Sequence, residues 1–426
     1  MKRFTVIWAG QFLSLTASAM TIFALTVWLW QETGQATTVA LQGFFSFAPG
    51  LLLGVLAGVV ADRFNRKWVM LAADGAAGLG TLGVLLLLEG GTLQVWHLYV
   101  LGAWSGAAGT FQVPAFAAAV ASLVPKAQFA RANAMRSFAS SGAQVAAPAL
   151  AGLLLALTGL KTILLLDLLA LGVAALALLT VRIPSHGQKG GTLSSAGALA
   201  GFSFLKRQPA LFQLTLAFTS LQFFGMLGVT VLAPLILTRT GGDEAVYGLV
   251  SAAIGAGGVA GALFMSIRGG RGHETRTIGL GIAAGSAGLA ALGLASSPPG
   301  WMLAAAGAFF FFPLVGAASG AVKQRKVPPP LQGRVFAADQ LLQTAGIACG
   351  ILSAGPLADR VFEPAFLSGA RWLPAAAGSA PPGTGMAFML VLAGVCGVLT
   401  GVAVLASPAI RTIERTVPDH DGPAPR

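Results

Sequence analysis

Two aspartates that interrupt long apolar stretches are the residues of this chain most able to do chemistry. Asp167 lies in the sequence ILLLDLLAL, and Asp74 lies in LAADGAAG. A carboxylate is costly among apolar residues, and one found there is a candidate for binding and releasing a proton. We expect Asp167 to be the proton carrier, with Asp74 as the second candidate. The alternatives for Asp167 are a side chain at the outer end of its segment that reaches the polar interface, or one that packs on the lipid side.

Histidine and cysteine form no pattern for catalysis or metal binding. None of the four histidines belongs to a His-Glu-x-x-His pair, and the two cysteines have no Cys/His spacing typical of a metal site. The Gly-x-x-x-x-Gly-Lys loop that binds nucleotide phosphates is also absent. We therefore predict that the protein is not an enzyme and that it uses no metal and no cofactor.

The composition is that of a membrane protein. Hydrophobic residues make up 55% of the 426 positions and charged residues 9%, where soluble domains have about 25% charged residues. Apolar stretches of about 20 residues cross a bilayer as helices, because a helix satisfies its own backbone hydrogen bonds. We predict an all-α polytopic membrane protein with twelve spans, at residues 4–30, 39–61, 68–88, 95–124, 134–158, 162–181, 211–237, 247–267, 277–296, 301–322, 335–358 and 386–407.

The positions of lysine and arginine predict the orientation of these spans. With both termini cytoplasmic, 22 of the 26 Lys and Arg residues lie on the cytoplasmic side, as the positive-inside rule requires. The same residues account for the net charge of +12, so we do not expect a nucleic-acid partner. We expect a monomer in the lipid bilayer of a bacterial inner (plasma) membrane. The four outward exceptions are Lys161, Arg239, Arg360 and Arg371.

An internal repeat divides the chain into two halves. One shift of 203 residues aligns Pro125 with Pro328 and Arg131 with Arg334. We predict an N-terminal six-helix bundle at 1–181, a cytoplasmic linker at 182–210, a C-terminal six-helix bundle at 211–407 and a cytoplasmic tail at 408–426. Paired bundles of this kind in transporters carry a site between them and rock around it, so the repeat predicts a transporter.

The densest cluster of charge lies in GVVADRFNRKWVM, residues 58–70. It resembles the signature that transporters of the major facilitator superfamily carry between their second and third helices. Together with the twelve spans and the repeat, the resemblance covers essentially the whole chain. The residues that carry it are Gly58, Asp62, Arg63, Asn65, Arg66 and Lys67.

The resemblance implies a latch on the cytoplasmic side. Asp62 and the arginines after it would hold the two halves together, against the start of the span at 335–358. Asp339 lies one or two turns inside that span and would receive Arg63 or Arg66. We expect Asp74 to support the same latch.

Small residues in and beside this cluster have two expected roles, in helix packing and in the turn. Gly54 and Gly58 are four positions apart, which would let another helix approach closely. Asn65 stands where the family usually has glycine. Asparagine tolerates a positive φ better than most residues, so we expect the turn to be preserved.

The span at 134–158 contains SGAQVAAPALAGL, which is similar to the helix-five element of exporter branches through Pro148 and Gly152. Proline and small residues would let this helix bend and pack against its neighbour, and ordinary small-residue packing is the alternative. One family feature is missing, because Gly102 stands where proton-coupled exporters carry an arginine. This difference puts the usual route of proton coupling in question.

The family arrangement places the substrate cavity among the first and fourth spans of each half. The expected lining is aromatic and amide, without a charged cluster, which suits a bulky amphipathic molecule. Simple helix packing is the alternative for each residue. The cavity candidates are Gln11, Ser14, Trp104, Phe111, Gln112, Gln222, Phe223 and Phe310.

Two further segments, AGQFLSLTASAMTIFAL and VPPPLQGRVFAADQ, are similar to the branch that contains macrolide efflux pumps and enterobactin-type siderophore exporters. The resemblance implies proton-coupled efflux by alternating access, as in antiporters that give multidrug resistance. The substrate would be a drug, macrolide, siderophore or other natural product. The alternatives are a flippase for lysophospholipids or other lipids and an uptake carrier on the same scaffold.

Overall fold

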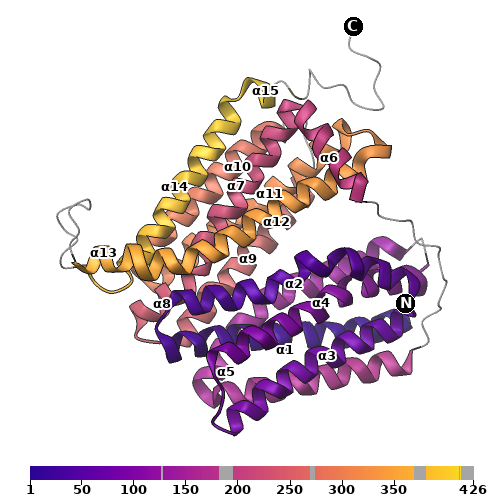
Figure 1. Ribbon diagram of the computed structural model, residues 1–426, viewed down its shortest axis with the longest axis vertical. Helices are drawn as coiled ribbons and strands as arrows, with labels where there is room; N and C mark the ends of the chain where they lie inside the picture. The colour runs from indigo at the N-terminus through magenta and orange to yellow at the C-terminus, as the bar shows by residue number, and fades with distance from the viewer. Residues whose placement is uncertain (126–127, 182–194, 269–273, 369–379, 412, 414–426) are drawn as a thin grey trace. The chain divides into compact units, whose positions relative to one another are not determined.

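Helices form nearly all of the computed structural model, which describes residues 1–125, 128–181, 195–268, 274–368, 380–411 and 413. The described part contains no strand. Figure 1 labels the helices in chain order. They are α1 (Lys2–Thr33), α2 (Ala36–Arg63), α3 (Arg66–Glu89), α4 (Val95–Leu123), α5 (Phe129–Thr180), α6 (Ser195–Arg207), α7 (Pro209–Thr230), α8 (Leu232–Thr240), α9 (Glu244–Arg268), α10 (Glu274–Leu294), α11 (Pro298–Lys326), α12 (Pro329–Leu357), a π-helix (Ala358–Phe362), α13 (Glu363–Ser368), α14 (Thr384–Ala406) and α15 (Pro408–Arg411).

The described residues fall into two compact units. The first contains those of Met1–Thr192 and Thr240–Ala252, and the second contains those of Leu193–Arg239 and Ala253–Arg426. In the first unit α1 packs along α5, α2 packs along α4, and α3 contacts both α4 and α5. The long α5 is broken at Gly159, which has a φ of 78° and a ψ of 177°. Glycine adopts this backbone conformation readily, whereas other residues would be strained in it.

Close helix packing builds the second unit. There α10 contacts α11 and α14, while α7 contacts α12 and α14. A Cβ atom added to Gly401 would lie 2.6 Å from the backbone nitrogen of Ala283, so α14 and α10 approach at the van der Waals limit. Gly257 likewise allows α9 to pack closely against the backbone of α11.

Gly54 and Gly58 of α2, which the shift of 203 residues aligns with Gly257 and Gly261, differ from the prediction. A Cβ added to either would meet no atom of the described first unit within 4 Å, so neither glycine marks a close helix approach there. The tight contact of α2 is made to Gly106 of α4, where an added Cβ would collide with the backbone of Ser46. The small residue needed for packing is therefore on α4.

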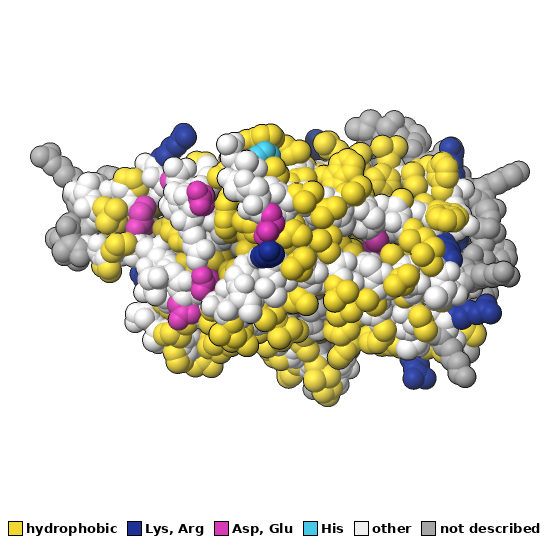
Figure 2. Space-filling model, turned by 90° about the horizontal axis from the view of Figure 1, so that it is seen from below, with side chains coloured by type: hydrophobic (Ala, Val, Ile, Leu, Met, Phe, Trp, Pro, Cys, Tyr) yellow, Lys and Arg dark blue, Asp and Glu magenta, His cyan; other side chains and the backbone are white. Residues whose placement is uncertain are grey.

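Ten helical segments among the described residues are long and apolar enough to cross a membrane. Two features affect that count. The segment Arg131–Thr180 includes the break at Gly159, and α4 has 29 residues but is not among the ten. Figure 2 shows hydrophobic side chains over most of the face in view. Leu52, Ile267 and Leu303 are each more than 75% exposed, as lipid-facing side chains should be.

Part of the predicted linker at 182–210 is helical, since α6 occupies Ser195–Arg207. Its Leu205 is 1% exposed and lies in the core of the second unit beside Leu211 and Leu214. Residues 182–194 of the linker and 414–426 of the tail are outside the described residues. The domain boundaries themselves remain predictions.

Candidate functional site

Asn65 starts α3 by capping it. The side-chain oxygen of Asn65 accepts a hydrogen bond from the backbone N–H of Lys67 at 3.1 Å. This contact satisfies one of the N–H groups that a helix start leaves unpaired. The φ of Asn65 is −65°, so the predicted turn with positive φ is wrong. Asparagine suits either role, and here its side chain serves as the cap.

The two cations after Asn65 bind the ends of neighbouring helices in the first unit. Arg66 donates to the carbonyl oxygen of Ala118 at 3.1 Å and to the hydroxyl of Ser122, near the end of α4. The ammonium of Lys67 donates to Leu179 and Val181 at 2.9 and 3.0 Å, at the end of α5. Cations are favourable there because the last carbonyls of a helix are unpaired.

The predicted latch between the two halves stays a prediction. Arg63 is exposed, and the side chain of Asp62 lies outside what the structure describes. The expected partner, Asp339, is 7% exposed and has its own contacts in the second unit. Its Oδ1 lies 2.6 Å from the ammonium of Lys323.

Two more donors complete the surroundings of Asp339. Thr215 of α7 donates to its Oδ1 at 2.7 Å, and Gln343 of α12 donates to its Oδ2 at 2.8 Å. The acid therefore has a buried cation and two hydrogen bonds inside its own unit. The expectation that it also receives Arg63 or Arg66, which belong to the other unit, stays a prediction.

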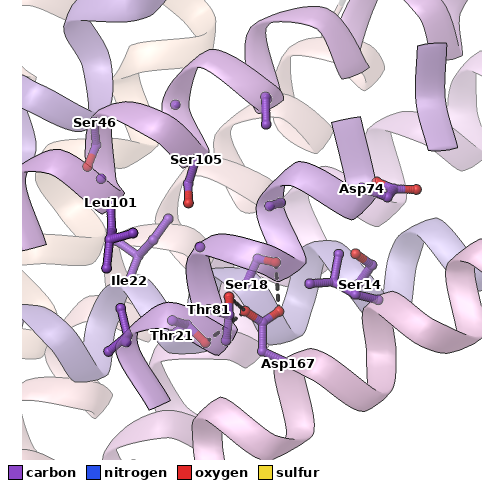
Figure 3. A pocket seen from close by; sticks show the side chains of 18 of the residues that line it. Ser14, Ser18, Thr21, Ile22, Ser46, Asp74, Thr81, Leu101, Ser105 and Asp167 are labelled. Atoms are coloured by element: carbon purple, nitrogen blue, oxygen red, sulfur yellow. Dashed lines mark hydrogen bonds between the residues drawn. The ribbon is translucent and has the colours of Figure 1, made fainter. Parts of the chain in front are cut away.

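Asp167 lies deep in the first unit and is 1% exposed. Three hydroxyl groups donate to its carboxylate (Figure 3). The Ser18 hydroxyl of α1 donates to Oδ1 at 2.8 Å. Thr21 of α1 and Thr81 of α3 donate to Oδ2 at 3.2 and 2.8 Å. The alternatives of a side chain at the polar interface or on the lipid side are therefore wrong, since Asp167 faces the interior among α1, α3 and α5.

Asp74 of α3 is held by two amides. The Gln11 amide donates to its Oδ2 at 2.9 Å, and the Gln112 amide donates to its Oδ1 at 2.8 Å. Gln112 also donates to the side-chain oxygen of Gln11 at 2.7 Å, which joins α1, α3 and α4 in one network. The prediction that Asp74 supports the cytoplasmic latch is corrected, because its hydrogen bonds belong to this network.

Both aspartates line one pocket of about 290 Å³ inside the first unit. Figure 3 shows Asp167 with its hydroxyl donors on one side and Asp74 on another, with Ser14 between them. The predicted cavity residues Gln11, Ser14 and Gln112 line it as well. The lining was expected to lack an anionic cluster, and it contains two carboxylates.

The two predicted aromatic residues of this half do not line that pocket. Trp104 and Phe111 line a separate hollow of about 580 Å³, beside Asn65 and Trp68. The indole N–H of Trp104 donates a hydrogen bond to the carbonyl oxygen of Ala76 at 2.7 Å, and the side chain is half exposed. Gly102, by contrast, lines the pocket of the two aspartates, and a Cβ added to it would lie 2.8 Å from the hydroxyl of Ser46. An arginine at this position would not fit without rearrangement.

The cavity candidates of the second half take part in helix packing. Gly350 of α12 approaches the carbonyl oxygen of Phe223, which an added Cβ would meet at 2.5 Å. Phe310 of α11 contacts the rings of Phe264 and Phe311, with centroids 5.6 and 5.2 Å apart. Gln222 is partly buried in α7. The ring contacts support a packing role for Phe310, while the contact of Phe223 with Gly350 is made by its backbone.

The sequence of this chain matches the Major Facilitator Superfamily over residues 7–351. The chain belongs to this superfamily. The predicted resemblance is thus confirmed, and the chain is a multi-pass membrane transporter.

Two efflux proteins are among the similar curated relatives. Macrolide efflux protein A of Streptococcus pyogenes is 26% identical over 375 residues, which cover 84% of this chain and 90% of that protein. Enterobactin exporter EntS of Shigella dysenteriae serotype 1 is 29% identical over 306 residues, which cover 70% of this chain and 71% of that protein. Both branches named by the sequence resemblance are represented.

Solved structures of superfamily members share the fold. A bacterial homologue of the human lysosomal transporter Spinster, inward-facing and unoccupied, has a TM-score of 0.70 at 16% identity and covers 97% of this chain and 98% of its own. The nucleoside transporter NupG has a TM-score of 0.70 at 12% identity and covers 95% of this chain and 99% of its own. At this identity the likeness shows the fold alone.

The helix-five element of this superfamily member lies at a close helix crossing. A Cβ added to Gly152 would lie 2.6 Å from the carbonyl oxygen of Glu244 and 3.1 Å from the Cα of Gly248. A Cβ added to Gly248 would lie 2.5 Å from the carbonyl oxygen of Pro148. Pro148 and Gly152 therefore form a small-residue contact with the first turns of α9, which belong to the first unit.

Sequence reasoning missed most of the hydroxyls of the pocket, although their spacing was a usable signal. Gln11, Ser14, Ser18 and Thr21 recur at three or four positions along α1. Residues at this spacing share one face of a helix, so they form a polar stripe on an otherwise apolar span. Such a stripe is expected to face a polar interior, and here it faces both aspartates.

Proposed function

We propose that this protein is a proton-coupled exporter of bulky amphipathic small molecules, working by alternating access in a bacterial inner membrane. The efflux relatives support export, and macrolides and enterobactin are the substrates that their names suggest. The carboxylate of Asp167 supports proton coupling, because it is buried and accepts hydrogen bonds from three hydroxyls without a cation partner in the described structure. Transport itself would use Asp167 as the group that takes up and releases the proton.

The proposal includes twelve spans in two groups of six, with both termini in the cytoplasm. Ten candidate segments support it, together with the break at Gly159 that divides one of them and the 29 residues of α4. The placement of 22 of the 26 Lys and Arg residues on one side supports the orientation.

The test is a change of the proposed proton carrier. In inside-out proteoliposomes with an acidic interior, the unaltered protein should accumulate radiolabelled macrolide or enterobactin against its gradient. Asp167→Asn removes the titrating group and keeps the size of the side chain. We expect it to lower pH-driven accumulation at least tenfold while downhill counterflow continues, because binding and rocking need no proton step.

The matched control is Glu32→Gln, which removes an exposed carboxylate outside the pocket and should leave both rates unchanged. Equal pH-driven rates for Asp167→Asn and the unaltered protein would refute Asp167 as the carrier. Translocation of labelled lysophospholipid without transport of either soluble compound would favour the flippase. Accumulation only in right-side-out vesicles would favour the uptake carrier.

A further inference from the structure

The polar pocket of the first unit has an excess of negative charge. Asp74 and Asp167 are 7% and 1% exposed, and neither forms an ion pair in the described part of the chain. Among the described residues that line the pocket there is no lysine, arginine or histidine. Buried carboxylates without a cation are unfavourable, so the site favours a ligand that brings positive charge.

Two neutral side chains add acceptors without partners. The side-chain oxygens of Gln112 and Gln42 are buried and accept no hydrogen bond from the described residues, and both residues line the pocket. The amide orientation of Gln112 is determined by its neighbours, because its nitrogen donates to Asp74 and to Gln11. Its oxygen is therefore left for a donor from outside the protein, since an unpaired buried acceptor is costly.

The carboxylate of Asp74 has acceptor capacity left. Each of its oxygens accepts one hydrogen bond, from Gln11 and Gln112, and a carboxylate oxygen can accept about two. Asp167 is closer to saturation, because its Oδ2 already accepts from two hydroxyls. A cationic ligand would therefore pair with Asp74, while Asp167 stays available for the proton.

The rest of the lining defines the kind of cation. The described lining contains no aromatic ring of the sort that recognises quaternary ammonium groups. The apolar wall is aliphatic, from residues such as Leu15, Ile22 and Leu101. A volume of about 290 Å³ is at the small end of ligand pockets, which range from about 300 to 1,000 Å³. The pocket therefore suits one end of a bulky molecule.

We propose that this pocket binds the protonated, N–H-bearing amine of an amphipathic substrate, with Asp74 as its ionic partner and the Gln112 oxygen as a hydrogen-bond acceptor. The inference rests on the proposed export function, and it narrows the substrate class to lipophilic amines. An alkyl chain next to the ammonium would lie against the aliphatic wall.

The experiment compares two fluorescent probes that differ in charge. Monodansylcadaverine carries a primary ammonium, and its N-acetyl derivative is neutral with almost the same apolar body. Binding of each is titrated to the purified full chain in nanodiscs by dansyl fluorescence. We expect the amine to bind at least tenfold more tightly than the acetylated probe, and Asp74→Asn to remove most of this difference.

Two variants separate recognition from folding. Asp74→Glu keeps the charge and should retain the preference for the amine. Gln42→Leu removes one unpartnered oxygen and no charge, and it serves as the test if Asp74→Asn fails to fold. We expect Gln42→Leu to weaken amine binding severalfold. Glu32→Gln, which removes an exposed charge, should bind both probes as the unaltered protein does.

The outcomes distinguish this site from the export function. Equal affinity for the two probes, with active export of a neutral amphiphile, would overturn the amine site and leave the exporter proposal standing. A clear preference for the amine without transport of any compound would support the site and overturn the exporter proposal. An unchanged preference in Asp74→Asn would refute Asp74 as the ionic partner.

Discussion

The buried carboxylates of the two units have different kinds of partner. In the first unit, the carboxylates of Asp74 and Asp167 are surrounded by neutral amide and hydroxyl donors. In the second unit, Asp339 has a full counter-charge in Lys323, whose ammonium also lies 5.1 Å from the ring of Phe218. A carboxylate with neutral donors can change its charge or take up a cation, whereas a paired one leaves a buried cation uncompensated if it loses its own charge.

This contrast gives a prediction for the Lys323–Asp339 pair. Both side chains are at most 10% exposed, so removing one leaves the other buried without its partner. Such one-sided removal costs about 3–5 kcal/mol, whereas removing both is much less unfavourable. We expect Lys323→Met and Asp339→Asn each to lower the thermal unfolding midpoint in detergent, and the double variant to recover most of the loss. Additive losses in the double variant would show that the two groups act independently.

The positions of the two candidate aspartates could be predicted from the sequence, and their hydrogen-bond partners could not. An aspartate in an apolar span is visible in a short window, which is why Asp74 and Asp167 are candidates from the sequence alone. Ser18, however, is 149 residues from Asp167, and Thr81 is 86 residues away. Only the packing of α1 and α3 against α5 brings these donors together. Asp74 was assigned to the wrong cluster for the same reason.

At the scale of the helices, small residues determine where two elements can meet. Gly54 and Gly58 of α2 align with Gly257 and Gly261 of α9 in the repeat, yet among the described residues only the pair in α9 lies against another backbone. Composition predicts that close contacts exist, but the register of the neighbouring helix decides which glycine makes one. The helical spans themselves followed from the apolar runs, because a membrane helix is encoded locally.

The contact between α5 and α9 is testable with two glycines of α5, one on each side of its break at Gly159. A Cβ at Gly152 would lie 2.6 Å from a backbone oxygen, while a Cβ at Gly172 would meet nothing within 4 Å. We expect Gly152→Ala to lower the thermal midpoint and the transport rate, since the backbone of α9 must shift. Gly172→Ala should be neutral or slightly stabilising, by up to about 1 kcal/mol from helix propensity. Equal behaviour of the two variants would show that this crossing contributes little to stability or to transport.

At the scale of the whole molecule, the layout depends most on α4. This helix carries Gly102 and Gln112 of the pocket. Its 29 residues are long enough to cross a bilayer, although it is not among the ten candidate segments. The helices α1, α2, α3 and the two parts of α5 make five spans, so six spans in the first half require that α4 crosses as well.

Cysteine labelling can decide whether α4 crosses the membrane. Thr92 and Gln128 are exposed residues on either side of α4, and the proposed orientation places the first outside and the second in the cytoplasm. After Cys349 and Cys396 are replaced by alanine, a membrane-impermeant maleimide should label Thr92→Cys in intact cells. It should label Gln128→Cys only after permeabilisation, because the lipid bilayer then no longer shields it. Labelling of both sites in intact cells would show that α4 does not cross, and the reverse pattern would place the termini outside. A crossing α4 would put Asp74, Asp167 and the Gln112 amide among transmembrane helices, where the proposed exchange of a proton for an amine requires them to be.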